Sequence, residues 1–333
     1  MIKRFFILYI GIVILFSACG DKTEYLQFGP GYKEGSSLYK FYNKWGKDYR
    51  DGPGPGYGDG TSASDPGGFK APTGIFIKNV NGQEIVYVVD TGNNRVERFT
   101  TEGDIIGFTA LGSAVLGSEG NADGKFENPV GICINSSNQI LVADEYNGRI
   151  QKFDNDGNFL LKIGNYTNFT FSHPVGVAVD NNNNIYVCDS VSNNIKKFTS
   201  AGTLITSWGG LNNPYDIEIN NGEVYVSDSG NHRIVVFDTS GNKKRVIGSF
   251  GYTVTKLNQP EGIAVDNNYI YVVDGNYIKI FNKSSGTFVT YLGGLRGKGD
   301  GEFYNPSDVA VDSSGNIYIT DTYNNRIQIF KKE

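Results

Sequence analysis

Short apolar runs separated by polar turns occupy most of the chain. From residue 69 to residue 330, runs of four to six β-branched and aromatic residues alternate with turns of Asn, Asp, Ser and Gly. Runs of this length and composition, with such turns between them, are typical of β-strands joined as hairpins. The pattern therefore predicts an all-β fold built from many short antiparallel strands.

These strands fall into six repeated segments, each marked by a proline. Every one of these prolines follows a Phe or Leu three positions earlier and precedes an apolar run such as Gly176-Val177-Ala178-Val179. A second apolar run ends in an aspartate, and a third run ends in phenylalanine. The prolines are Pro72, Pro129, Pro174, Pro214, Pro260 and Pro306, and the aspartates are Asp90, Asp144, Asp189, Asp228, Asp274 and Asp321. Four of the five proline spacings lie between 40 and 46 residues, the size of one four-stranded propeller blade.

The residues of each segment also match a known repeat. The order Pro-x-Gly-Ile-x-Val, then Ile-Tyr-Val-x-Asp, then Asn-x-Arg-Ile-x-x-Phe resembles the NHL repeat over residues 69 to 330. The resemblance implies a six-bladed β-propeller of four-stranded antiparallel blades, which we place at residues 36 to 333. It also implies interaction with proteins or other macromolecules.

The last segment lacks a fourth strand, which suggests how the ring closes. The sixth segment ends at Phe330, with three residues remaining. The stretch from Leu38 to Gly46 has the composition of an outer strand. We therefore predict that this N-terminal strand completes blade six and closes the propeller.

In four segments an arginine follows the aspartate by five residues. We expect each repeat aspartate to bond backbone N–H groups in its turn and to pair with this arginine. Six equivalent copies indicate a structural role, so function should lie where the copies differ. The arginines are Arg95, Arg149, Arg233 and Arg326.

The N-terminus has the pattern of an export signal. Lys3 and Arg4 precede an apolar run of 12 residues, which is too short for a stable membrane span but suits a signal peptide. The following Phe16-Ser17-Ala18-Cys19 resembles a bacterial lipobox, with Phe in place of the usual Leu. We predict a signal peptide at 1–18, a lipidated Cys19 with a tether at 19–35, and a bacterial cell-envelope location, periplasmic or extracellular. The alternative is a plain secretory signal with an unmodified Cys19.

Charge and composition exclude several classes of partner and site. A net charge of −5 gives no overall positive field for a phosphate backbone, so we expect no nucleic-acid partner. Only two histidines, His173 and His232, are present, too few for a multi-histidine metal centre. Cys133 and Cys188 occupy small-residue strand positions in different segments, and we favour two buried free thiols over a disulfide.

Acidic residues break the repeat at the start of the innermost strands. Asp216 and Asp308 replace the glycine two residues after proline, Glu261 precedes that glycine, and Glu218 takes a position that is alanine elsewhere. Oxygen ligands at one end of the central channel would suit Ca²⁺, the single candidate cofactor. The alternative interpretation is that each carboxylate caps backbone groups or pairs with a nearby Lys or Arg.

Other departures from the repeat suggest a binding surface. Asn194 and Tyr277 replace the turn arginine in blades three and five. Three long, glycine-rich loops enter one face, at Gly46 to Ala71, Leu111 to Asn128 and Gly293 to Asn305, and the other three connections are shorter. Long loops on one rim of a rigid scaffold often form binding surfaces. On the first of these, Tyr49 and Tyr57 are candidate aromatic anchors for a protein or glycan.

We therefore predict a monomeric, lipid-anchored propeller that binds a protein or glycan on its long-loop face without catalysis. The alternative is a divalent-cation-dependent hydrolase or lactonase that uses the acidic residues of the channel. Related calcium lactonases use acids and asparagine in the channel, a set that this sequence matches only loosely. Related amidating lyases need more zinc-binding histidines than this chain contains.

Overall fold

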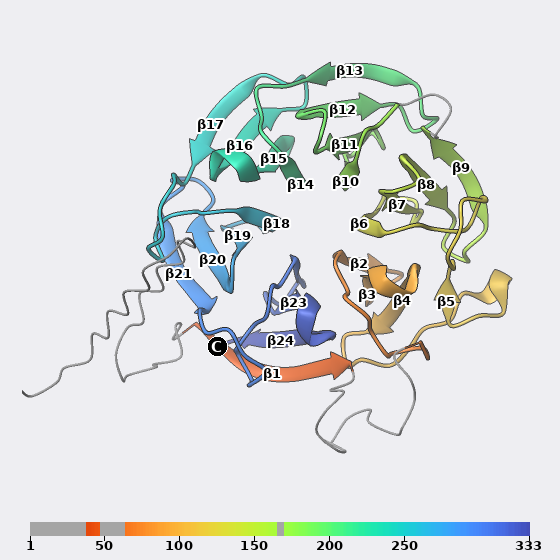
Figure 1. Ribbon diagram of the computed structural model, residues 1–333, viewed down its shortest axis with the longest axis horizontal. Helices are drawn as coiled ribbons and strands as arrows, with labels where there is room; N and C mark the ends of the chain where they lie inside the picture. The colour runs from red at the N-terminus through yellow and green to blue at the C-terminus, as the bar shows by residue number, and fades with distance from the viewer. Residues whose placement is uncertain (1–37, 47–63, 165–169) are drawn as a thin grey trace, which may run out of the picture.

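Six four-stranded antiparallel sheets surround a central axis, with one strand of each sheet innermost (Figure 1). The computed structural model describes residues 38–46, 64–164 and 170–333. The all-β prediction and the six-bladed propeller are confirmed, with four short 3-10 turns as the only helical elements in these described ranges. Within the same ranges, no helix has the length and apolar character needed to cross a membrane.

Each blade except the last is continuous in the sequence. Blade one consists of β2 (Ile75–Val80), β3 (Gln83–Asp90), β4 (Arg95–Thr100) and β5 (Val115–Leu116), and blade two of β6 (Pro129–Ile134), β7 (Ile140–Asp144), β8 (Arg149–Phe153) and β9 (Phe159–Ile163). Blade three consists of β10 (Pro174–Val179), β11 (Ile185–Asp189), β12 (Asn194–Phe198) and β13 (Leu204–Trp208), and blade four of β14 (Pro214–Asn220), β15 (Glu223–Asp228), β16 (Arg233–Asp238) and β17 (Lys243–Ile247). Blade five consists of β18 (Pro260–Val265), β19 (Tyr269–Asp274), β20 (Tyr277–Asn282) and β21 (Phe288–Gly293), and blade six of β22 (Asp308–Val311), β23 (Ile317–Asp321), β24 (Arg326–Lys332) and β1 (Tyr39–Gly46). The 3-10 turns are η1 (Thr91–Asn93), η2 (Thr109–Leu111), η3 (Ser229–Asn231) and η4 (Thr322–Asn324).

The core lies between neighbouring blades. One apolar cluster, for example, joins Tyr87 and Val89 of blade one to Phe126 and Ile140 of blade two. Central strands are buried on both faces, so their runs are continuously apolar rather than alternating. The Phe or Leu three residues before each proline is buried as part of this packing.

Strand β1 closes the ring, in agreement with the sequence prediction. It pairs antiparallel with β24 from Tyr39↔Lys332 to Gly46↔Arg326. Trp45 packs on Phe99 of blade one with ring centroids 5.6 Å apart, so β1 also joins the blade beyond its own. Burial of a large aromatic side chain at this junction stabilises closure.

The repeat aspartates form buried clamps at the face where the innermost strands begin. Asp144 accepts a 2.7 Å bond from the N–H of Glu127 in the preceding connection and pairs with Arg149 Nε at 2.7 Å. Arg149 also donates to three carbonyls of that connection, those of Asn121, Ala122 and Lys125. The predicted Asp–Arg pairs are thus confirmed, and they also hold the connection against its blade.

The connections at this face differ in two respects from the sequence prediction. The stretch from Leu111 to Asn128, expected as a loop, contains β5, which pairs with β4 as the fourth strand of blade one. The connection from blade four to blade five, expected to be short, has the same local pairing as two of the long connections. The three isolated parallel bridges are Glu119↔Phe126, Phe250↔Leu257 and Arg296↔Phe303.

Candidate binding face and central channel

The innermost strands approach one another closely around the channel. A Cβ built on Gly131 of blade two would lie 2.2 Å from the Val175 carbonyl of blade three, which is why glycine occupies this position in four blades. Asp216 and Asp308 replace that glycine in blades four and six. Their carboxylates lie at the junctions between blades and also line the channel.

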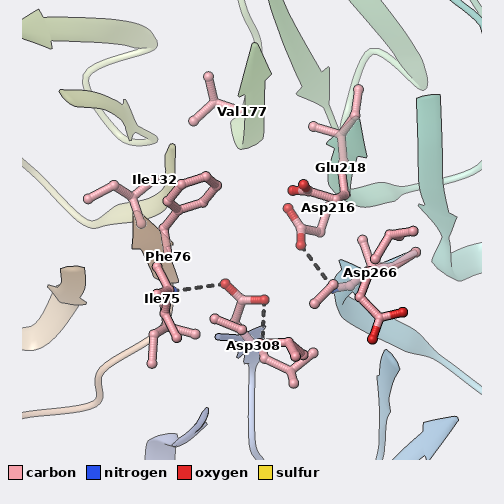
Figure 2. A pocket seen from close by; sticks show the side chains of 16 residues that line it. Ile75, Phe76, Ile132, Val177, Asp216, Glu218, Asp266 and Asp308 are labelled. Carbon is pink, nitrogen blue, oxygen red and sulfur yellow. Dashed lines mark hydrogen bonds between the residues drawn. The ribbon is translucent and has the colours of Figure 1, made fainter. Parts of the chain in front are cut away.

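Two of these carboxylates bond the backbone of the next blade. Asp216 Oδ2 accepts a 3.0 Å bond from the N–H of Ile263 in blade five. Asp308 Oδ2 accepts a 2.9 Å bond from the N–H of Ile75 in blade one. Figure 2 shows both carboxylates, together with that of Glu218, facing the same space, while the carboxylate of Asp266 points away.

This space is a small cavity of about 110 Å³. Asp216, Glu218 and Asp308 supply its acidic lining, and apolar residues such as Phe76 supply the rest. Since each water molecule occupies about 30 Å³, the cavity has room for only a few waters. It is smaller than the roughly 300–1,000 Å³ typical of small-molecule pockets.

The acids that line this cavity are buried, and the described residues contain no ion pair to them. Their pKa values are therefore raised. Burial raises the pKa of Asp216 to about 6. Burial, with the charge of Asp216 added, raises the pKa of Glu218 to about 8. The pKa of Asp308 is also well above its usual range because of burial and the neighbouring Asp216. The channel therefore holds protons near neutral pH.

The structure separates the four predicted metal ligands along the channel. Glu261 lies at the mouth, outside the lining of the acidic cavity, and burial raises its pKa to about 7. Glu218 lies deeper and also lines the next cavity toward the far end of the channel. Within the described residues, no group of three or more His, Cys, Asp or Glu side chains has the geometry to hold a metal ion. Two of the four carboxylates also bond backbone N–H groups, so the set fits a metal poorly.

The turn arginine is replaced by Asn194 in blade three and by Tyr277 in blade five, and in each of these blades a lysine pairs with the repeat aspartate. In blade three Lys196 takes over the arginine's role and pairs with Asp189 at 2.6 Å. The Asn194 Oδ1 atom is buried and has no hydrogen-bond partner in the described structure. In blade five Lys279 pairs with Asp274 at 2.6 Å, and Tyr277 packs edge-on against Tyr291.

Cys133 and Cys188 are buried free thiols, as the sequence analysis favoured. Tyr49, Tyr57 and Cys19 lie outside the described residues.

A set of exposed aromatic residues, which the sequence analysis missed, lies on the face where the innermost strands begin. We call this face, defined by Tyr146, Phe250, Tyr252 and Tyr323, the aromatic face. Tyr146 is 51% exposed, Phe250 53%, Tyr252 73% and Tyr323 56%. All four lie in turns or connections that end beside the repeat prolines.

Neighbouring polar groups hold these aromatic residues in place. Phe250 packs at a tilt against His232, with ring centroids 4.6 Å apart, and edge-to-face against Tyr252 at 5.3 Å. His232 Nδ1 bonds the carbonyl of Asn258 on the same connection. On blade six, Tyr304 packs on Tyr323 at 5.0 Å, and the Arg296 guanidinium lies 4.0 Å from the Tyr304 ring. The aromatic face therefore presents ordered aromatic side chains rather than free loop tips.

The repeats define the class of protein: a six-bladed β-propeller that carries NHL repeats. The NHL repeat family model matches residues 126–153, 171–198, 211–237 and 303–330. The chain is similar to human "NHL repeat-containing protein 3", with 30% identity over 123 residues, 33% of this chain and 35% of the relative. The match thus spans about a third of that relative's length.

Solved structures share the fold at low sequence identity. A gluconolactonase from Xanthomonas campestris aligns with a TM-score of 0.60 and 14% identity, over 80% of this chain and 87% of the other. Virginiamycin B lyase from Staphylococcus aureus aligns with a TM-score of 0.54 and 14% identity, over 79% of this chain and 95% of the other. At this identity the likeness establishes the propeller fold and leaves the chemistry of this chain to its own residues.

Proposed function

We propose that the protein is a non-enzymatic binding module, held by lipid on Cys19 to a bacterial envelope membrane, whose aromatic face takes a protein ligand. The observation that carries this proposal is the group of exposed aromatic residues on the aromatic face. Aromatic residues and arginine dominate the energetics of protein interfaces because they bury large areas at low entropic cost.

A protein ligand is favoured over a glycan for this face. The aromatic residues stand in separate groups on blades two, four to five, and six, with Arg296 beside the last group. A ligand that contacts all of them must cover much of the rim, as a folded protein surface can. A single sugar chain would meet one group at a time.

The test is photo-crosslinking of the full-length protein in its own envelope, with the crosslinker at Lys256 beside the Phe250 group. We expect a discrete crosslinked protein that disappears in a Phe250→Ser/Tyr252→Ser double variant. Loss of two anchor residues should weaken binding by about 2 kcal/mol or more. The matched control, Leu204→Ser/Ile205→Ser, changes two exposed apolar residues on the outer strand β13 and should retain the crosslink. A crosslink unaffected by the Phe250/Tyr252 change would contradict the proposal.

The lipid anchor has a test of its own. Cells supplied with a labelled fatty acid should incorporate it into the wild-type protein and not into a Cys19→Ser variant. An unlabelled wild-type protein released into solution would instead support a plain secretory signal with an unmodified Cys19.

A second candidate function is a divalent-cation-dependent hydrolase. Its supporting observation is that Asp216, Glu218 and Asp308 line one cavity. Elemental analysis of the dialysed protein tests it directly. About one Ca²⁺ per chain in the wild type, lost in Asp216→Asn, would support this candidate and justify a lactone and ester screen. A metal-free protein that stays metal-free after incubation with Ca²⁺ would remove it.

A further inference from the structure

Two adjoining cavities lie at the end of the channel opposite the aromatic face, the inner one lined by residues of blades one to four and the outer one by residues of blades three and four. One, of about 160 Å³, lies at the channel and is lined in part by Lys78, Ser136 and Glu218. The other, of about 270 Å³, extends outward to Lys197 and Thr239. Both are lined by Asp180 and Asn181, so they form one continuous groove. We call the outer part the amide groove; it is lined by the apolar Val179 and Ile219 and by Asp180, Asn181, Asn182, Asn184, Lys197, Asn221, Gly222 and Thr239.

The groove exists because two neighbouring turns differ in length. The turn of blade three is the run Asp180-Asn181-Asn182-Asn183-Asn184, whereas blade four turns within Asn221-Gly222. A Cβ added to Gly222 would meet no atom within 4 Å, so the side of the groove formed by blade four is open.

Side chains close the corresponding space at other junctions. Between blades six and one, Glu84 on the longer hairpin of blade one accepts a 2.8 Å bond from the N–H of Ser313. Between blades four and five, the Asn220 amide donates a 3.0 Å bond to the Val265 carbonyl. In the parts of the chain that the structure describes, no hydrogen bond links Asn181 or Asn182 to blade four. Those two junctions are bridged at their turns, whereas the junction of blades three and four is bridged farther out, where Lys197 Nζ donates to the Thr239 carbonyl.

The charged groups of the amide groove are already satisfied. Asp180 Oδ1 accepts the N–H groups of Asn182 and Asn184, and its Oδ2 accepts bonds from the Asn184 amide and the Tyr186 hydroxyl. Lys197 Nζ donates a 2.9 Å bond to the Thr239 carbonyl and lies 5.0 Å from the Tyr186 ring centroid. The groove thus offers neither a free carboxylate for a cation nor a fully free ammonium for an anion.

The groups that remain free are neutral amides. The side chains of Asn181, Asn182 and Asn221 line the groove, and each amide supplies both a donor and an acceptor. A hydroxyl group likewise donates and accepts, so neighbouring hydroxyls of a sugar match neighbouring amides. We propose that the amide groove binds a neutral, hydroxyl-rich ligand, namely one sugar unit of a glycan. Asn181, Asn182 and Asn221 are exposed residues, so a ligand without hydroxyls would displace water from their amides without replacing its hydrogen bonds and would lose affinity.

This site is independent of the proposed function, because it lies on the opposite face. Failure of one proposal therefore does not affect the other. Variants in the amide groove should leave the crosslink at the aromatic face unchanged.

The experiment is saturation-transfer NMR on the full chain in detergent micelles, with glucose, galactose, mannose and N-acetylglucosamine as probes at millimolar concentration. We expect transfer to at least one sugar. Asn182→Trp, which fills the groove from an exposed position, and the milder Asn181→Ala/Asn182→Ala should each reduce the signal at least tenfold. The matched control is Asn267→Trp, an exposed asparagine in the corresponding turn of blade five, which should bind like the wild type.

Two results would overturn the proposal. One is the absence of transfer to all four sugars with the folded wild-type protein. The other is transfer that persists in Asn182→Trp or falls equally in Asn267→Trp. The alanine variant keeps the test valid if the tryptophan variant does not fold.

Discussion

Two sets of enclosed carboxylates lie a few residues apart on the same blades and have opposite surroundings. The repeat aspartates stand in all six blades, and each pairs with an arginine or lysine. The channel acids Asp216, Glu218 and Asp308 occur in blades four and six, and their strongest contacts are backbone N–H groups and one another. The first set holds the connections in place, whereas the second lacks ion-pair partners among the described residues and retains protons near neutral pH.

The pKa values follow this difference only in part. Hydrogen bonds from His173, Ser172 and Lys196 outweigh burial and hold the pKa of Asp189 below its usual range, whereas burial raises the pKa values of Asp90 and Asp144 in spite of their arginines. In the channel, burial and neighbouring carboxylates raise the pKa values of all three acids. Each repeat aspartate therefore has a cationic partner. Asp216, Glu218 and Asp308, which depart from the repeat, have none among the described residues.

Removal of a clamp arginine should have the largest effect. Arg326→Met leaves Asp321 buried and unpaired and removes the bonds to three carbonyls of the preceding connection. We expect a loss of about 3–5 kcal/mol in the free energy of unfolding, measured by urea titration. Arg233→Met in blade four is the matched control, because Arg233 is more exposed and bonds that connection weakly, with one 3.4 Å contact. Equal losses in both variants would show that the bonds to the connection contribute nothing.

The channel acids should make stability depend on pH in the opposite sense to ordinary acid denaturation. Glu218 binds a proton in the folded state up to about pH 8, whereas the unfolded chain releases it near pH 4.5. The folded state therefore binds more protons in this window, and stability falls as the pH rises from 4.5 to 8. Glu218→Gln should raise the free energy of unfolding at pH 8 by on the order of 2 kcal/mol and leave it unchanged at pH 4. A variant with the wild-type pH profile would contradict the assigned cause.

The bond between blades should have a smaller, separable effect. Asp216→Ala leaves the N–H of Ile263 without its acceptor, which costs about 1–2 kcal/mol at low pH. Asp216→Asn keeps an acceptor oxygen and should unfold like the wild type at pH 5. If the alanine variant is as stable as the asparagine variant at that pH, the bond does not stabilise the junction.

Asn194 should show the smallest effect. Its Oδ1 atom is buried without a hydrogen-bond partner in the described structure, so Asn194→Ala removes an unsatisfied group. We expect a change within about 0.5 kcal/mol, neutral or stabilising, in the same urea titration. A loss above about 1 kcal/mol would indicate a partner such as an ordered water at this position.

The repeat made the scaffold predictable from the sequence. Blade number, the Asp–Arg pairs and closure by the strand at Tyr39–Gly46 all follow from positions that recur or from one missing strand. The lysine substitutes Lys196 and Lys279 were missed, although a signal was present. Each lysine stands two residues beyond the position of the missing arginine. Because alternate residues of a strand share a face, this spacing predicts that the lysine can reach the same aspartate.

The candidate sites were less predictable, because exposure depends on contacts between distant segments. Phe250 and Tyr252 resemble core aromatics in the sequence and are exposed only because their connection folds over His232 of the preceding turn. The acids of the channel stand out in the sequence as departures from the repeat. Their positions along the channel axis depend on the register of the innermost strands, which the sequence does not give. The amide groove depends on the difference between two turn lengths, which becomes meaningful only when the blades are placed side by side.

Closure by β1 has a consequence for the order of events during synthesis. Tyr39 leaves the ribosome long before its partner Lys332. Blades one to five can each form from consecutive strands, while blade six must wait for β24. Such distant pairing is slow and leaves an edge exposed in the meantime. Until β24 has formed, therefore, the unclosed ring is the species that most needs protection by a chaperone.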